Sequence, residues 1–398
     1  MREAVIVEAV RTPVGRRNGA LSNTHPVELL ATTLQELFAR TGVDAGLVED
    51  HITGCVSQVG EQALNIARNA WIAAGLPDTV PATTVDRQCG SSQQALHFAA
   101  QAVLSGAQDL VVASGVESMS RLGMGSSIAT GGFPFTESMQ RRYDGNLVPQ
   151  GISSELIAAR WDLSREQVDE IGFRSQQRAQ AAWTEGRFER EVFPVKVSNG
   201  ETKLFEMDEG LRETSLQKLA SLKPAFYSED AAARFPGIRW VTTAANSSQI
   251  SDGAAAVMVT TPEKAKELGL KPRARFHSFA VAADDPVLML TAVIPATRKA
   301  LDRAGLKLND IDVVEINEAF ATVLLAWKAD LGADDRWFDA NVNPNGGAIA
   351  LGHPLGASGA RLMTTLLHEM ERRGARYGLQ TMCEGGGMSN ATILERLS

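Results

Sequence analysis

Val85-Asp86-Arg87-Gln88-Cys89-Gly90-Ser91-Ser92 joins a β-prone run to a helix, with a cysteine in the turn between them. Apolar residues then recur with helical spacing at Leu96, Ala99, Ala100, Val103 and Leu104. The stretch therefore predicts that Cys89 lies at a helix N-terminus, where free N–H groups and the helix dipole stabilise a thiolate. A small buried apolar cysteine is the alternative, and this stretch alone does not decide between the two.

Composition limits the classes of protein to which the chain can belong. Its 398 residues predict two or three domains, and 44% hydrophobic with 22% charged residues is typical of a globular protein. A net charge of −8, from 39 basic and 47 acidic residues, argues against a nucleic-acid surface. Three cysteines without a CxxC pair favour a reducing compartment and disfavour both a disulfide framework and a zinc site.

Strand and helix patterns alternate along the chain, which predicts an α/β fold with a predominantly parallel sheet. The expected strands are 4–10, 48–56, 83–85, 109–114, 254–259 and 377–382. The expected helices are 26–38, 62–74, 93–104, 164–182 and 262–268.

The last third of the chain resembles the first. Gly42 precedes Cys89 at nearly the same spacing as Gly305 precedes His353, and each of the two strands 109–114 and 377–382 leads into a glycine-containing turn. We therefore expect two similar α/β halves packed face to face, with Cys89 and His353 in matching loops. Chance similarity between two α/β units is the alternative.

Glycine and proline break the regular patterns in the middle of the chain, which predicts an inserted loop domain. The expected boundaries are 1–121 for the first half, 122–248 for the insertion, 249–271 for the completion of the first half, and 272–398 for the second half.

Four turns carry reactive or hydrogen-bonding groups, and such turns gather at the carboxyl ends of strands in α/β sheets. Cys89 is the candidate nucleophile, His353 its base, and Cys383 a second thiol able to move a proton. The N–H of Gly385 can join that of Cys89 in an oxyanion hole, and Asn317 can donate to a second oxygen.

Other sequence signals predict no further chemistry. We assign no catalytic role to the remaining histidines and expect Cys55 to be structural. We expect no metal, because no candidate ligands have metal-motif spacing, and no nucleotide loop, because neither a dinucleotide fingerprint nor a P-loop occurs. The histidines concerned are His25, His51, His97, His277 and His368.

Taken together, these motifs resemble the thiolase family over essentially the whole chain. They are Arg11-Thr12-Pro13, Cys89-Gly90-Ser91, Gly115-x-Glu117-Ser118-Met119-Ser120, Asn317-Glu318-Ala319-Phe320-Ala321, Asn345-Gly346-Gly347 through Gly352-His353-Pro354-x-Gly356 to Gly359, and Cys383-x-Gly385-Gly386-Gly387. The resemblance implies a thiolase-like fold: two duplicated α/β halves in five αβαβα layers with an inserted loop domain.

The resemblance also implies the reaction. Cys89, activated by His353, would attack the 3-keto carbon of a 3-ketoacyl-CoA, and Cys383 would protonate the acetyl-CoA enolate that leaves. CoA, deprotonated by Cys383, would then take the acyl group. His353 and a water held by Asn317 would stabilise the enolate oxygen, and the Cys89 and Gly385 amides the thioester oxyanion.

Coenzyme A enters this scheme as a co-substrate, with no tightly bound cofactor. By position in the family's motifs, Ser248 is the expected pantetheine contact and Lys223 a basic residue near the nucleotide, with a solvated lysine as the alternative. Ala319 and Phe320 are expected as further CoA contacts. The expected partners are acyl-CoA and CoA in a cytoplasmic homodimer or homotetramer, without nucleic acid or membrane.

Two departures bear on the substrate. Short-chain members of the family usually carry a His-Met pair where Pro149-Gln150 stands here, and Ser92 stands where glycine is frequent. These departures resemble bacterial thiolases for longer or steroid-type acyl chains. A biosynthetic acetoacetyl-CoA thiolase remains the alternative, and a non-catalytic acyl-CoA or sterol carrier a more remote one.

Overall fold

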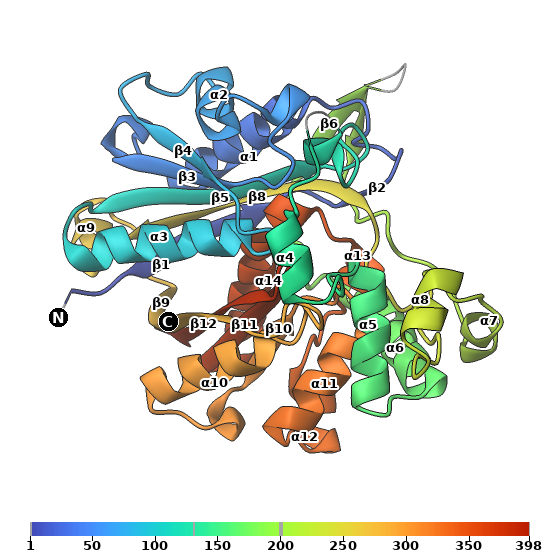
Figure 1. Ribbon diagram of the computed structural model, residues 1–398. Helices are drawn as coiled ribbons and strands as arrows, with labels where there is room; N and C mark the ends of the chain where they lie inside the picture. Colours follow the sequence, from blue (N-terminus) through green and yellow to red (C-terminus); the bar gives the residue numbers. More distant parts are fainter. Residues whose placement is uncertain (1, 130–131, 199–201, 398) are drawn as a thin grey trace.

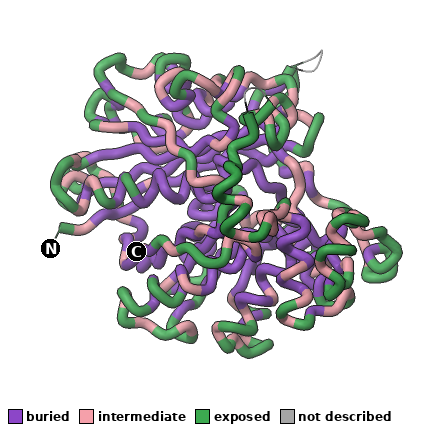
Figure 2. Tube along the Cα trace, viewed as in Figure 1, coloured by how far each residue is buried: buried purple, intermediate pink, exposed green. Residues whose placement is uncertain are grey.

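The computed structural model describes residues 2–129, 132–198 and 202–397, and it has five layers (Figure 1). Helices α1 and α2 cover one group of strands, α10, α11 and α12 cover a second group, and α3 and α14 lie between the two groups (Figure 1). The expected α/β fold of two halves is confirmed. Buried residues are concentrated in the strands and in the two central helices (Figure 2).

The first half comprises β1 (Val5–Arg11), β2 (Gly15–Arg16), α1 (Pro26–Thr41), β3 (Asp50–Gly54), α2 (Ile66–Ala73), β4 (Ala82–Val85), α3 (Ser91–Ser105), β5 (Leu110–Ser118), β8 (Ser251–Thr260) and α9 (Pro262–Glu267). The second half comprises β9 (Ala274–Ala283), α10 (Val293–Ala304), β10 (Val313–Ile316), α11 (Ala321–Leu331), α12 (Asp335–Asn341), α13 (Ala348–Leu351), α14 (Ser358–Arg373), β11 (Tyr377–Glu384) and β12 (Met388–Arg396).

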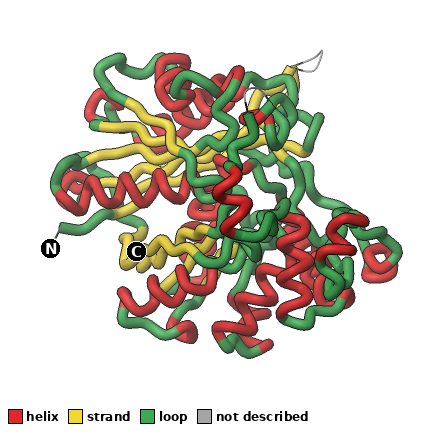
Figure 3. Tube along the Cα trace, in the orientation of Figure 1, coloured by secondary structure: helices red, strands yellow, loops and turns green. Residues whose placement is uncertain are grey.

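Between β5 and β8 lie α4 (Glu137–Arg142), α5 (Gln150–Arg160), α6 (Arg165–Thr184), β6 (Val195–Ser198), β7 (Thr202–Phe205), α7 (Leu216–Ala220) and α8 (Glu229–Arg234). This segment is mostly helix and loop (Figure 3). Ser164 caps α6 through a capping box with Gln167, which fixes where that helix begins.

The strands join in the order β10-β11-β12-β9-β1-β8-β5-β3-β4, with β2 beside β8. The expectation of a predominantly parallel sheet is wrong: only β10/β11, β3/β4 and β3/β5 are parallel pairs among the described strands. Two features reverse the chain. The turn 385–387 joins β11 to β12, and a turn this short can join only antiparallel strands. After the insertion, β8 runs antiparallel to both β1 and β5.

The two halves meet tightly at α3 and α14. A β-carbon on Gly359 of α14 would lie 2.2 Å from the backbone nitrogen of Gln93, and one on Gly115 would lie 2.4 Å from the Gly356 carbonyl oxygen. Only glycine permits such an approach. It brings the N-termini of α3 and α14, and the loops before them, to one place.

Candidate active site

Cys89 lies in the turn between β4 and α3. Asp86 accepts a hydrogen bond from the Gln88 N–H at 2.6 Å, and Ser91 Oγ accepts one from the Arg87 N–H at 2.9 Å. Gln88 takes a positive φ of 49°, so the chain turns sharply just before the cysteine. Cys89 is buried, with 3% of its surface exposed, and packs beside Met119 and Met382.

The charge balance at Cys89 differs from expectation. Burial is the largest influence and raises the pKa of the thiol, and Cys383 and Glu384 raise it further. The backbone N–H groups of Cys89 and Gly385 act in the opposite direction but are outweighed. The expectation that the helix N-terminus stabilises a thiolate is therefore wrong for this closed site, because desolvation dominates.

His353 lies in the loop between α13 and α14, and its tautomer is fixed. Nδ1 is 2.6 Å from Ser358 Oγ, and the Ser358 hydroxyl donates its one proton to the Pro354 carbonyl at 2.8 Å. Ser358 must therefore accept from Nδ1–H, which leaves Nε2 unprotonated and free to act as a base. Burial and Arg361 lower the pKa of His353 to about 3, so the ring is neutral.

Asn317 directly follows β10, and its amide connects His353 to the second thiol. Nδ2 is 3.3 Å from His353 Nε2, and the Asn317 side chain also hydrogen-bonds Cys383, lowering the pKa of that thiol. Burial outweighs this effect and raises the pKa of Cys383 to about 12. The pKa of this thiol is therefore far above the neutral range.

Gly385 opens the turn between β11 and β12. Gly386 and Gly387 take positive φ values of 82° and 80°, which the turn needs and glycine supplies. The Gly385 N–H favours a charged Cys89, as an oxyanion donor would.

The structure thus brings Cys89, His353, Asn317, Cys383 and Gly385 into one neighbourhood. Among the described residues no hydrogen bond joins His353 directly to Cys89; Asn317 joins His353 to Cys383, and a charge on Cys383 acts on Cys89. In the resting site the imidazole and both thiols are uncharged. The imidazole and the two thiols together can move protons and carry an acyl group.

Several supporting residues were not singled out from the sequence. Buried Glu117 accepts bonds from the N–H groups of Val56, Ser57 and Gly356 at 2.9–3.0 Å, which ties the His353 loop to the first half. Glu318 does the same for α13 by accepting from the Ile349 N–H at 3.2 Å. The Gly-x-Glu and Asn-Glu-Ala-Phe motifs contained both carboxylates, but nothing local in sequence names their distant partners.

The expected CoA contacts occupy different environments. The Ser248 N–H donates to the Ala319 carbonyl at 2.9 Å, and the segments around these two residues lie side by side. Ala319 and Phe320 are buried, and the Phe320 ring meets Phe226 with centroids 5.8 Å apart. Lys223 is exposed.

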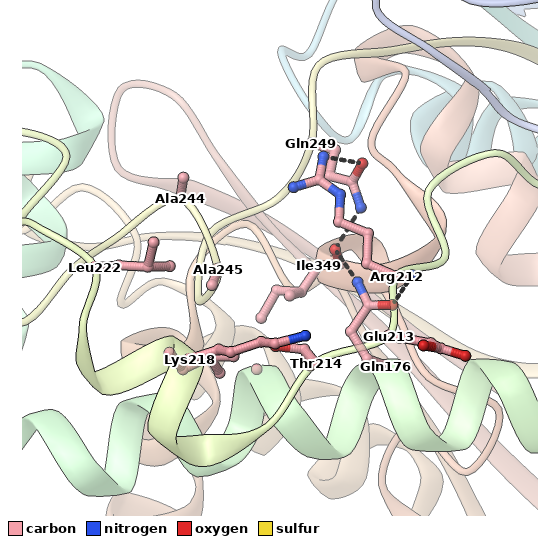
Figure 4. Close-up of a pocket in the computed structure, with 12 residues that line it drawn as sticks. Gln176, Arg212, Glu213, Thr214, Lys218, Leu222, Ala244, Ala245, Gln249 and Ile349 are labelled. Atoms are coloured by element: carbon pink, nitrogen blue, oxygen red, sulfur yellow. Dashed lines mark hydrogen bonds between the residues drawn. The ribbon is translucent and has the colours of Figure 1, made fainter.

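A cavity of about 170 Å³ lies beside this segment (Figure 4). Ala244, Ala245 and Leu222 lie toward one end and the polar side chains of Arg212 and Gln176 toward the other (Figure 4). The complete lining is Gly172, Gln176, Arg212, Glu213, Thr214, Lys218, Leu219, Leu222, Ala244, Ala245, Gln249 and Ile349. Arg212 and Lys218 thus offer positive charge where the sequence pointed to Lys223.

The remaining histidines have local partners. His25 caps α1 at the Val27 N–H, His51 and His97 bond hydroxyls of buried neighbours, His368 meets the Thr364 carbonyl, and His277 lies against Tyr377. Cys55, like the two other cysteines, is free and buried. Within the described ranges, no three His, Cys, Asp or Glu side chains are placed to hold a metal ion, and no helix has the length and apolar character to cross a bilayer.

Comparisons with known proteins agree along the full chain. The family model described as thiolase, N-terminal domain, matches residues 4–263, and that described as thiolase, C-terminal domain, matches 270–396. Steroid 3-ketoacyl-CoA thiolase FadA6 of Mycobacterium tuberculosis is 52% identical, covering 100% of this chain and 95% of that protein.

Two further relatives cover both chains almost entirely. A 3-ketoacyl-CoA thiolase of Photobacterium profundum is 44% identical over 100% of both chains. The crystal structure of an acetyl-CoA acetyltransferase of Bacillus anthracis superposes with a TM-score of 0.87 at 36% identity, covering 100% of this chain and 99% of that one.

Proposed function

The chain belongs to the thiolase family and is a 3-ketoacyl-CoA thiolase, and we propose that it works by ping-pong acyl transfer through a thioester at Cys89. The single observation that supports this mechanism best is the meeting of two thiols with one neutral imidazole in a buried site. One thiol can carry the acyl group while the other moves the proton.

The first step uses the fixed tautomer of His353. Nε2 takes the proton of Cys89, whose sulfur attacks the 3-keto carbon, and the Cys89 and Gly385 N–H groups receive the negative oxygen. The Cα–Cβ bond then breaks. The acetyl-CoA enolate takes its proton from Cys383, while Asn317 and His353 stabilise the enolate oxygen.

The second step returns every proton. CoA enters, gives its thiol proton to the Cys383 thiolate and attacks the acyl group on Cys89. When the tetrahedral intermediate collapses, the Cys89 sulfur leaves and recovers its proton from His353. Because both thiols are costly to ionise in this site, each proton transfer must be coupled to bond formation.

We propose that segments 1–121 and 249–271 form the first half and that 272–398 forms the second. The insertion, 122–248, would provide the surface that binds CoA. Ser248, Ala319 and Phe320 would contact the pantetheine arm. Arg212 and Lys218, which line the cavity beside Ala244 and Ala245, would attract the phosphates together with Lys223. Replacing Arg212 and Lys218 with Met should raise KM for CoA and for the 3-ketoacyl-CoA alike, because both carry the same phosphates, while changing kcat little.

We propose a bulky, steroid-type or long acyl chain as the preferred substrate. Two facts support this: Pro149-Gln150 replaces the His-Met pair of short-chain enzymes, and the relative at 52% identity is named a steroid thiolase. A biosynthetic acetoacetyl-CoA activity is the second candidate, because the matched solved structure is named an acetyl-CoA acetyltransferase. Thiolysis rates over a panel from acetoacetyl-CoA to polycyclic 3-ketoacyl-CoA esters separate the two.

The covalent step has its own test. Incubation with a 3-ketoacyl-CoA should add the mass of the shortened acyl group to the Cys89 peptide, and Cys89→Ala should abolish both that adduct and turnover. Adduct formation on the Cys89→Ala variant would contradict the assignment of the nucleophile.

We further propose a homodimer or homotetramer working in the cytoplasm. Three free cysteines, two of them needed as thiols, favour a reducing compartment. Size-exclusion chromatography with light scattering measures the assembly.

A further inference from the structure

Glu384, between Cys383 and Gly385, is a buried carboxyl for which the mechanism gives no role. It ends β11 and is 0% exposed. Neither of its two buried carboxyl oxygens has a hydrogen bond of ordinary geometry in the described part of the chain, and the Asn390 N–H is the backbone donor near enough to act on its charge. Since an unpartnered buried carboxyl destabilises a fold, such a group needs a reason other than packing.

The carboxyl lies against the turn of the nucleophile. A β-carbon on Gly90 would fall 1.9 Å from Glu384 Oε1, so Gly90, directly after Cys89, makes the room that this side chain occupies. Alternation along β11 places Met382 and Glu384 on one face of the strand, and Met382 packs beside Cys89.

Neighbouring amide side chains between α3 and the second-half strands each have a bonded nitrogen and an unpartnered buried oxygen, whereas neither polar atom of the Glu384 carboxyl has a partner among the described residues. Gln93 Nε2 donates to Thr392 at 2.8 Å, and Asn390 Nδ2 bonds His97 Nδ1 at 2.9 Å. Gln380 Nε2 donates to the Gly359 carbonyl at 2.8 Å. Glu384 differs from these amides because its side chain can carry a negative charge and has no bonded nitrogen to hold it in place.

The charges around Glu384 do not compensate it. Burial raises its pKa well above the usual range; Arg87 and the nearby Asn390 N–H act against this, while Asp86 adds to it. His97, on α3, is neutral because burial and Arg87 lower its pKa to about 3. The remaining ionisable groups here are Cys89 and Cys383, and a negative charge on Glu384 raises the pKa of both thiols.

We propose that Glu384 is a positioning residue that competes with Cys89 and Cys383 for the negative charge this closed site can hold, and so sets the pH range in which the thiols react. The inference rests on the proposed thiol chemistry. A carboxyl is intrinsically about four pKa units more acidic than a thiol, so rising pH removes its proton before theirs. Like charges in one buried cluster then make each thiolate harder to form.

The test compares wild type with Glu384→Gln, which keeps the shape and removes the charge. We would follow the rate of iodoacetamide alkylation of Cys89 from pH 6 to 10 by peptide mass spectrometry. We expect the alkylation midpoint of the variant to move to lower pH by about one unit, and its thiolysis profile to move the same way. Midpoints that coincide, or a move to higher pH, would overturn the proposal.

Two further variants separate charge from packing. Glu384→Met is a second neutral side chain and must give a shift of the same sign; a shift in only one neutral variant would mean packing and would overturn the proposal. Glu315→Gln is the matched control, because Glu315 is also buried with both oxygens unpartnered among the described residues, but the cation that acts on it is Arg361 and neither thiol is among the groups that influence it. Its alkylation midpoint should equal that of wild type.

The experiment also keeps this inference apart from the function. Alkylation needs no acyl-CoA, so a shift in a protein that fails to cleave 3-ketoacyl-CoA would contradict the proposed function alone. Normal thiolysis with an unchanged midpoint would contradict this inference alone.

Discussion

At the scale of single residues, the site works with groups that are uncharged at rest. Burial raises the pKa of both thiols and lowers that of His353. The sequence indicated which residue types to expect at the site, because each motif is local in the chain, and the structure brings those residues into one neighbourhood. The sequence indicated the wrong direction for the Cys89 pKa, because desolvation depends on everything packed around the turn.

Ser358 should be needed for the base to function. Ser358→Ala removes the acceptor of His353 Nδ1–H, so the ring loses the bond that fixes its tautomer and orientation. We expect kcat for thiolysis to fall by roughly tenfold or more, with KM for CoA little changed. Ser278→Ala is the control. The buried hydroxyl of Ser278, on β9, donates to the Ala300 carbonyl of α10 at 2.6 Å, and its loss should leave kcat at the wild-type value. An unchanged kcat in Ser358→Ala would contradict the tautomer argument.

Glu117 should hold the His353 loop in place. Glu117→Gln replaces an oxygen that accepts from backbone N–H groups with an amide that donates, leaving a Val56, Ser57 or Gly356 N–H facing a donor. We expect a loss of about 1–3 kcal/mol in the free energy of unfolding, measured by urea denaturation, together with a lower kcat. Wild-type stability would show that the three backbone hydrogen bonds of this carboxylate are not needed for folding.

At the scale of elements, the helices were easier to predict than the pairing of the strands. Capping and apolar spacing located α1, α3 and α6 within a few residues, because these signals lie in the helix itself. Strand direction depends on where the chain returns after the insertion and after the turn 385–387, which no strand sequence records. The Ala360 N–H of α14 donates to Ser92 Oγ of α3 at 2.8 Å. This bond could not be predicted either, because its two residues lie far apart in the sequence.

The contact between α3 and α14 should tolerate no added atom. Gly359→Ala places a β-carbon 2.2 Å from the Gln93 nitrogen, so the two helices must separate and move Ser358 and His353 away from Asn317. We expect a loss of about 1–3 kcal/mol in stability and a lower rate of Cys89 acylation. Gly237→Ala meets nothing within 4 Å and serves as the control in both assays. Equal acylation rates would contradict the link between this packing and the site.

At the scale of the whole molecule, one buried arginine ties the insertion to the rest. Arg11 of β1 donates to Glu191 at 2.6 Å and to Asp208 at 2.8 Å, and Thr365 of α14 also donates to Glu191. The Arg-Thr-Pro motif was recognised as a family feature, but its partners lie more than 170 positions away, so only the structure explains it. Because α14 also carries Ser358, this network connects the insertion to the catalytic loop.

Arg11→Met should therefore weaken the assembly of insertion and halves in a pH-dependent way. The variant leaves Glu191 and Asp208 buried without their cation, at a cost of about 3–5 kcal/mol in the free energy of unfolding at pH 8. Burial already raises the pKa of Glu191, and loss of Arg11 raises it further. Between the unfolded and folded pKa values the folded variant then binds more protons than the unfolded chain, so its deficit shrinks as pH falls toward 5.

Urea titrations at both pH values measure this, with the exposed pair of Arg141 and Glu137 as a control: Arg141→Met should cost under about 1 kcal/mol at either pH. A deficit that stays constant with pH would mean that loss of Arg11 does not change the protonation of Glu191 in the folded state, which would contradict the role of Arg11 as its counter-ion.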